Sequence, residues 1–344
     1  MAFKRLDPED FIVSVDTVTQ PAWTGNVVSL STFFTSSAQT EDKSGKYYLS
    51  VFNKIQGEAD SSTQFDIAFC NKTGLGSTAF NPNVSLERTF TRTLYGQYRS
   101  LVLEDETKDF NFGGVNQDSF YVLSISRARY KEKLLPGSFT IILNGDGDSN
   151  PNLSLTDNSL DVTTPIYFGS QRAYNIVRGS EGKAFSGDGY TTNGYTTNSG
   201  SYGLFLPDTG TIILNAAALD LNNIQGINLS TEYNINSPDN NNLKLFNAIS
   251  ASGDFRMNSQ ETISTDFVFV RARNSEFNYS ENPSFISGLN GEVIYDYFIN
   301  NPQVYPTSVG LYNDSNELLA VAKLSRPLRK DFTKEALIRV RLDF

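Results

Sequence analysis

The sequence contains no histidine, and Cys70 is the only cysteine among its 344 residues. Histidine is the side chain that most often moves protons near neutral pH, and cysteine is a frequent nucleophile and zinc ligand. Most enzyme classes are therefore disfavoured, and the catalytic route left open is chemistry by carboxylates alone, as in glycosidases. We expect a protein without enzymatic activity, catalytic residues or cofactors, which works through shape and contacts.

Basic residues are few and thinly spread along the chain. There are 28 Lys and Arg against 38 Asp and Glu, which gives a formal net charge of −10. A protein that binds phosphates needs a basic face, so nucleic acid and anionic membranes are not expected as partners. No segment reaches about 18 consecutive apolar residues, so a membrane span is not expected either.

Features of exported proteins are also missing. The first ten residues lack the apolar stretch and the small-residue cleavage site of a signal peptide. A single cysteine permits no disulfide within the chain, which fits folding in a cytoplasm. Cys70 ends a segment in which Phe65, Ile67 and Phe69 alternate with other residues, so we expect it to be a small residue on a strand rather than a reactive thiol.

What the sequence has in quantity is aromatic and uncharged polar side chains. There are 17 Tyr and 25 Phe but one Trp and two Met, and charged residues make up 19%, below the usual value of about 25%. Many Asn, Ser, Thr and Gly favour strands and turns, whereas surface helices normally draw on Lys, Glu and Arg. The composition therefore predicts a mostly β fold, with antiparallel sandwich or barrel-like units, a few short helices and long polar loops.

Local patterns predict particular elements within this fold class. Leu94, Tyr98, Leu101 and Val102 recur at helical spacing and would share one face of a helix over residues 93–103. Two apolar runs flank a tight turn and predict a β-hairpin, formed by residues 204–206 and 211–214.

The chain is longer than the roughly 250 to 300 residues at which a single hydrophobic core stops growing, which predicts two core-forming units. Residues 150–165 are polar and contain Pro151 and Pro165, so we place the boundary there. The predicted units are β-rich and cover residues 1–150 and 151–344.

The second predicted unit contains a loop, residues 179–202, that is rich in Gly, Ser, Thr and Asn. Within it the pentad Gly-Tyr-Thr-Thr-Asn occurs twice in tandem, at 189–193 and 194–198. Such a segment cannot bury enough surface by itself, so we expect a long surface loop. Two interpretations stay open. Either the loop has no specific ligand, or it is an adaptable binding loop whose contact points are Tyr190, Tyr195 and Tyr202.

The last residues show the clearest strand pattern in the sequence. Ile338, Val340, Leu342 and Phe344 alternate with charged residues, which predicts an ordered strand with one apolar face. Its pairing partner is either a strand of the same fold or a neighbouring subunit, because an exposed edge of this kind invites aggregation. A second run, Phe267–Val270, is apolar at every position and is typical of a strand buried on both faces or at an interface.

Oxygen-bearing side chains alternate within residues 144–152, where Asp146, Asp148 and Asn150 are spaced as in a calcium-binding loop. A proline stands where the sharp turn needs glycine, and the twelfth position is Asp157 rather than Glu. A hairpin turn is therefore the preferred interpretation, and the three residues are weak metal candidates. Acidic residues elsewhere show no pairing that would mark a carboxylate active site.

Five stretches of the sequence resemble virion structural proteins of contractile-tailed bacteriophages, notably of myoviruses that infect cyanobacteria. They are RYKEKLLPG at 129–137, FVRARN at 269–274, FNYSENPSF at 277–285, VGLYND at 309–314 and LAVAKLS at 319–325. None of them is a catalytic signature. The resemblance implies a β-rich tail or baseplate component, present in several copies in the virion, assembled in the host cytoplasm and bound to other tail or baseplate proteins.

These observations favour a non-enzymatic structural subunit of a bacteriophage tail or baseplate that acts through subunit–subunit interfaces. The alternatives are a receptor- or glycan-binding module at the tail tip, with tyrosines stacked on sugar faces, and a carboxylate glycosidase. The residues expected at interfaces are aromatic or apolar: Tyr190, Tyr195, Tyr202, Phe267, Phe269, Phe277, Tyr279, Phe285, Ile338, Val340, Leu342 and Phe344.

Overall fold

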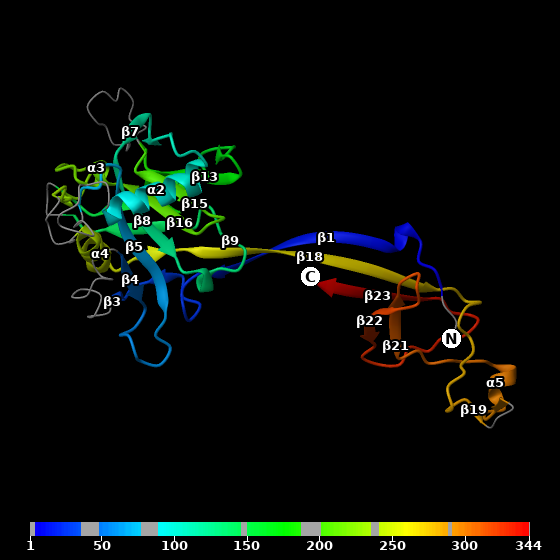
Figure 1. Ribbon diagram of the computed structural model, residues 1–344. Helices are drawn as coiled ribbons and strands as arrows, with labels where there is room; N and C mark the ends of the chain where they lie inside the picture. The colour runs from blue at the N-terminus through cyan, green and yellow to red at the C-terminus, as the bar shows by residue number, and fades with distance from the viewer. Residues whose placement is uncertain are drawn as a thin grey trace. The chain divides into compact units, whose positions relative to one another are not determined.

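The computed structural model describes residues 4–35, 48–76, 89–145, 150–186, 201–234, 241–287 and 291–343. The fold is mostly β, with 41% strand and 14% helix, which confirms the predicted fold class. The chain divides into two compact units (Figure 1). The terminal unit consists of Met1–Thr17 and Thr262–Phe344, and the central unit consists of Val18–Glu261.

This division differs from the predicted boundary near residue 150. Strands β10 (Thr140–Leu143) and β11 (Leu153–Asp157) pair antiparallel, from Thr140↔Thr156 to Leu143↔Leu153, so residues 144–152 connect two neighbouring strands of one sheet. The predicted boundary region, residues 150–165, thus contains β11, and the buried apolar residues of β10 and β11 belong to the same core.

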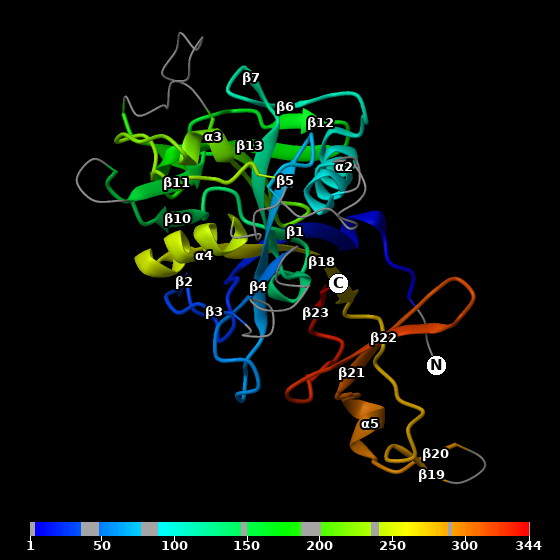
Figure 2. The same cartoon turned by 60° about the vertical axis from the view of Figure 1, so that its left-hand side comes forward.

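The central unit is built on one large, curled antiparallel sheet (Figure 2). Its strands follow the order β2 (Ser29–Leu30), β17 (Phe255–Arg256), β10, β11, β13 (Gln171–Ser180), β15 (Gly203–Leu206), β16 (Thr211–Asn215), β8 (Ser119–Ile125), β5 (Thr63–Asn71), β4 (Leu49–Phe52) and β3 (Phe34–Thr35). Strands β12 (Ile166–Phe168) and β14 (Lys183–Ala184) also pair with β13. The predicted hairpin is confirmed as β15 and β16, which pair from Gly203↔Leu214 to Leu206↔Thr211.

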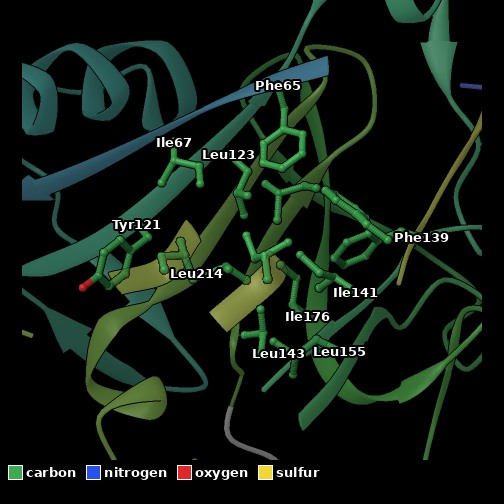
Figure 3. Packing of buried hydrophobic residues seen from close by; sticks show 14 of the residues in the cluster. Phe65, Ile67, Tyr121, Leu123, Phe139, Ile141, Leu143, Leu155, Ile176 and Leu214 are labelled. Atoms are coloured by element: carbon green, nitrogen blue, oxygen red, sulfur yellow. The ribbon is translucent and has the colours of Figure 1, made fainter. Parts of the chain in front are cut away.

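The middle strands of this sheet are buried on both faces. In β8, Tyr121, Leu123 and Ile125 belong to one hydrophobic cluster, whereas Phe120 and Val122, which alternate with them, belong to a second one. Because successive side chains of a strand point to opposite faces, each cluster occupies one face of the sheet. Figure 3 shows the larger cluster from close by. Burial of each large apolar side chain in these clusters stabilises the fold by about 1.5–3 kcal/mol. The two faces of this sheet therefore carry the hydrophobic core of the central unit.

The smaller cluster lies under helix α2 (Phe90–Leu103), which confirms the predicted helix and starts three residues earlier. Tyr95 and Val102 are buried in the cluster, whereas Leu101, which was predicted to share a face with Val102, is 43% exposed, so this part of the prediction is wrong. Leu101 follows Tyr95 by six positions, which is about 240° around the helix axis. Cys70 of β5 is buried in the same cluster, where burial raises the pKa of its thiol well above the usual value.

The remaining elements of the central unit are short. They are 3-10 turn η3 (Arg127–Arg129), helices α3 (Ala216–Leu219) and α4 (Asn241–Ser252), and strands β6 (Phe110–Phe112), β7 (Val115–Gln117) and β9 (Lys133–Leu134). Among the helices that the structure describes, none has the length and apolar character to cross a membrane.

The terminal unit is organised around strand β18 (Asn258–Ala272), whose sheet neighbours are β1 (Phe11–Pro21) and β23 (Ala336–Asp343). Strand β23 pairs antiparallel with β18 over eight positions, from Thr265↔Asp343 to Ala272↔Ala336. The last strand is therefore paired within its own chain. The division between the units falls inside β1 and β18. The other elements are η1 (Pro8–Asp10), β19 (Ile286–Ser287), β20 (Glu292–Val293), α5 (Tyr297–Asn300), β21 (Ser308–Tyr312) and β22 (Leu318–Lys323).

Candidate functional site

The terminal unit exposes apolar side chains of the kind that the central unit buries. Within the described ranges, only four of its hydrophobic residues are buried, Val268, Val304, Ala336 and Val340, and neither hydrophobic cluster includes any of them. Seventeen large hydrophobic side chains of this unit are exposed, and we call them the exposed apolar set: Phe11, Ile12, Val13, Val15, Tyr279, Val293, Ile294, Tyr295, Tyr297, Ile299, Tyr305, Tyr312, Leu318, Leu319, Val321, Phe332 and Leu337.

Strand β1 opens the exposed apolar set. Phe11, Ile12, Val13 and Val15 are 49%, 52%, 66% and 64% exposed. Consecutive positions of a strand face opposite sides, so apolar side chains are exposed on both faces of this strand. A strand with this pattern gains stability only when another surface covers it. These four residues were not predicted as interface residues, although the apolar run at the start of β1 was a sequence signal for them.

The hairpin of β21 and β22 carries a second part of the set. The two strands pair antiparallel from Ser308↔Lys323 to Tyr312↔Leu318 with an irregularity at Leu311 and Tyr312. Leu319 and Val321 of β22 are 68% and 62% exposed and, being two positions apart, lie on the same face of the strand. The run of apolar residues at 318–322 was the available sequence signal.

A group of aromatic rings surrounds helix α5. The ring of Phe285 lies 6.1 Å from that of Tyr295 and 5.7 Å from that of Phe298, both in edge-on geometry, and the rings of Tyr295 and Tyr297 lie 5.4 Å apart. Phe285 was a predicted interface residue, and it is half-buried. Tyr295 and Tyr297 are exposed and complete an aromatic surface that sequence reasoning had not identified.

Polar contacts rather than a core hold the loops of the terminal unit. The buried ammonium group of Lys330 donates hydrogen bonds to Asn278 Oδ1 at 2.8 Å and to the carbonyl oxygens of Asn274 at 3.0 Å and Asp331 at 3.3 Å. Burial lowers the pKa of Lys330 from its usual value. Lys4 also holds the 271–276 turn, with its Nζ 2.7 Å from the carbonyl oxygen of Arg271 and 3.0 Å from Glu276 Oε2. The unit is thus ordered while its apolar side chains remain at the surface.

Most of the other predicted interface residues lie on β18, on β23 or, in the sequence, between these two strands. Val340 is buried, Ile338 and Leu342 are half-buried, and the half-buried ring of Phe267 lies under Arg339, whose guanidinium carbon is 5.4 Å from the ring centroid. In addition, Phe269 and Phe277 are half-buried, and Tyr279 is 56% exposed. Within Phe267–Val270 only Val268 is fully buried, so the described strand is not covered on both faces. Phe344 lies outside the described residues.

The predicted tyrosine contacts of the 179–202 loop find no support in the structure. Tyr190 and Tyr195 lie outside the described residues. Tyr202 is 0% exposed, so its prediction as a surface contact is wrong. Its ring belongs to the larger hydrophobic cluster, and its hydroxyl donates a hydrogen bond to the carbonyl oxygen of Gln225 at 2.9 Å. The apolar run at 203–206 draws it into the core.

The residues considered for metal binding do not form a site where the structure describes them. Asp146 and Asp148 lie outside the described residues. Asn150 is buried, and its amide Nδ2 donates a hydrogen bond to Asn222 Oδ1 at 2.8 Å. In the described ranges no group of three His, Cys, Asp or Glu side chains is placed to hold a metal ion.

Among the described residues, two carboxyl groups have a raised pKa, and burial is the main cause for both. Asp157 accepts hydrogen bonds from the backbone N–H of Gly137 at 2.9 Å, and Asp66 accepts one from the hydroxyl of Ser50 at 2.5 Å. Each carboxyl group thus accepts a hydrogen bond from an uncharged group of a neighbouring strand or turn. These contacts position the backbone and form no pair of acids of the kind used by glycosidases.

Comparison of the chain with protein-family models, with curated proteins and with solved structures gave no match.

Proposed function

We propose that the chain is a non-enzymatic structural subunit of a bacteriophage tail or baseplate, which acts through subunit–subunit interfaces. The observation that carries the proposal is the contrast, among the described residues of the terminal unit, between seventeen exposed large hydrophobic side chains and four buried hydrophobic residues. A soluble monomer rarely leaves so much apolar surface uncovered, and a subunit of an assembly covers it on association. The stretches of the sequence that resemble phage virion structural proteins are the reason for proposing a tail or baseplate as this assembly.

The partner that this surface fits first is a second copy of the chain. Seventeen side chains that are each 38% to 76% exposed present roughly 1,000 Å² or more, since a large aromatic side chain alone offers about 150–250 Å². A stable interface needs about 800 Å² from each partner. Strands β1 and β23 are the two ends of their sheet path, so a second copy offers matching backbone edges as well.

The test is the molar mass of the purified full-length chain, measured by light scattering over a range of concentrations. We expect an oligomer whose mass falls toward that of the 38.1 kDa chain in the double variant Leu319→Asn, Val321→Asn. The matched control is Ile55→Asn, Ile224→Asn, which changes two residues of the central unit that are also more than half exposed and should keep the oligomer.

A wild-type chain that stays monomeric at high micromolar concentration would rule out self-association through this surface. Recovery of that monomer in a complex with another virion protein, lost in the Leu319 and Val321 double variant, would assign the surface to a different subunit. Equal loss of the oligomer in both double variants would show that the terminal unit has no special role.

A second candidate function is binding of a glycan receptor, and the aromatic surface at helix α5 favours it. Tyr295 and Tyr297 are 42% and 50% exposed and their ring centroids lie 5.4 Å apart, so aromatic surface is available to stack on a sugar ring. Titration of the protein with host-cell polysaccharide tests this function. Binding should weaken in Tyr297→Ala and persist in Tyr167→Ala, an exposed tyrosine of the central unit. Failure of the wild-type protein to bind the polysaccharide, or equal weakening of binding in the two variants, would remove this candidate.

A further inference from the structure

A cavity of about 240 Å³ lies in the central unit. It is lined by residues 20–26 at the end of β1 and in the turn that follows, by residues 128–131 around η3, and by Ser259 of β18. Sites for drug-sized ligands span about 300–1,000 Å³, so this cavity suits a smaller molecule or a single inserted side chain.

The charged groups of the lining are all cationic. Arg129 and Lys131 contribute to the wall, and no Asp or Glu does, although the chain as a whole has a net charge of −10. The ammonium group of Lys131 is neutralised by Glu261, with Nζ and Oε2 2.7 Å apart. Arg129 has no carboxylate partner among the residues that the structure describes, so its positive charge is available to a ligand.

The guanidinium group of Arg129 is held at one end only. Its Nη1 donates to Thr24 Oγ1, which also lies 2.8 Å from Gln64 Nε2 and 2.8 Å from Ser62 Oγ. The Nε of Arg129 is buried without a hydrogen-bond acceptor in the described part of the chain. An arginine presents two parallel N–H donors along its Nε and Nη2 edge, which matches the two oxygens of a carboxylate.

The elements that carry this arginine are fixed before any ligand arrives. The indole N–H of Trp23 donates to the carbonyl oxygen of Phe255 at 2.7 Å, which anchors the turn that bears Thr24. On the other side, the guanidinium of Arg127 lies 4.5 Å from the ring centroid of Tyr130 and donates to its carbonyl oxygen at 2.6 Å. Preorganisation of this kind reduces the entropy that binding must overcome.

We propose that this cavity binds a carboxylate group, with Arg129 as the residue that recognises it. The carboxylate belongs either to a small free acid or to an acidic side chain of another protein, and both present the same two oxygens. Binding gives the buried Nε the acceptor that it lacks, after a small shift of the side chain. Neutral analogues of the same shape do not bind, since they leave the guanidinium charge uncompensated.

Thermal unfolding of the full-length chain tests the proposal, with millimolar succinate as the free acid and acetyl-Ala-Glu-Ala-amide as the acidic side chain. Succinamide and the corresponding Gln peptide are the neutral controls. A ligand that binds the folded state raises Tm. Arg129→Gln should weaken binding about tenfold or more, and Arg129→Lys should weaken it as well, because it keeps the charge but loses the paired donors. Arg326→Gln removes one exposed positive charge elsewhere and should leave binding unchanged.

The outcomes separate the two sources of the carboxylate. A Tm increase with succinate alone assigns a free acid, and an increase with the Glu peptide alone assigns a protein side chain. The proposal is overturned by the absence of any increase with either carboxylate, by an equal increase with the neutral controls, or by an equal loss in Arg326→Gln. The Tm of each variant without ligand shows whether that variant is folded. If Arg129→Gln does not fold, Arg129→Lys provides the test.

Discussion

Replacement of Tyr202 by alanine should severely destabilise the central unit, although this residue borders a polar loop in the sequence. Its side chain is fully buried in the larger hydrophobic cluster, and its hydroxyl donates to Gln225. Deletion of a buried aromatic side chain costs about 3–5 kcal/mol, from lost transfer free energy and the cavity left behind. A neutral hydrogen bond contributes about 0.5–1.5 kcal/mol, so Tyr202→Phe should cost only this smaller amount. Folded proteins are stable by about 5–15 kcal/mol, so the alanine variant loses a large share of the total.

Urea unfolding followed by tryptophan fluorescence measures both changes. The single tryptophan, Trp23, is buried in the same cluster as Tyr202 and reports on its loss. The control is Tyr279→Ala, which removes a 56% exposed tyrosine of the terminal unit and should change the free energy of unfolding by about 0.5 kcal/mol or less. Equal changes in Tyr202→Ala and Tyr279→Ala would refute the assignment of Tyr202 to the core.

Three further predictions concern buried polar groups. Burial raises the pKa of Asp157, so this group stabilises the fold fully below about pH 4 and loses that contribution as the pH rises through its folded pKa; Asp157→Asn should flatten this part of the stability profile in urea unfolding. The thiol of Cys70 is buried and has a raised pKa, so it should react with a thiol reagent only after unfolding, and rapid reaction of the native protein would contradict its placement. Lys330→Met leaves Asn278 Oδ1 without its buried donor and should cost about 1–3 kcal/mol, seen as faster proteolysis of the 273–278 turn than in Lys334→Met, which changes an exposed lysine.

The strands and helices with strong local patterns were predictable from the sequence. The alternation at 338–342 predicted β23, the paired apolar runs predicted the β15 and β16 hairpin, and helical spacing predicted α2. These predictions succeed because the periods of strand and helix are properties of the local chain. The error at Leu101 has the opposite origin, since the direction in which α2 meets the sheet decides which residues are covered.

The exposed apolar set was harder to predict from the sequence than the fold. An apolar residue on a strand has the same local pattern whether another strand, a helix or solvent lies over it. Val340 and Leu319 are both apolar strand residues, yet one is 4% exposed and the other 68% exposed. Asn150 illustrates the same limit for polar groups, because its spacing fits a calcium loop while its side chain hydrogen-bonds with Asn222 from a distant part of the chain.

The sequence by itself determined the mostly β fold class, through its many aromatic and uncharged polar residues, and limited the available chemistry, through its missing histidines. Only the tertiary structure decided that residues from the two ends of the chain form one unit, that this unit leaves its apolar side chains exposed, and that Tyr202 belongs to the core. It also decided that Arg129 lines a cavity without acidic residues. The physical reason is that burial and charge pairing depend on which distant segments meet, and local patterns do not carry that information.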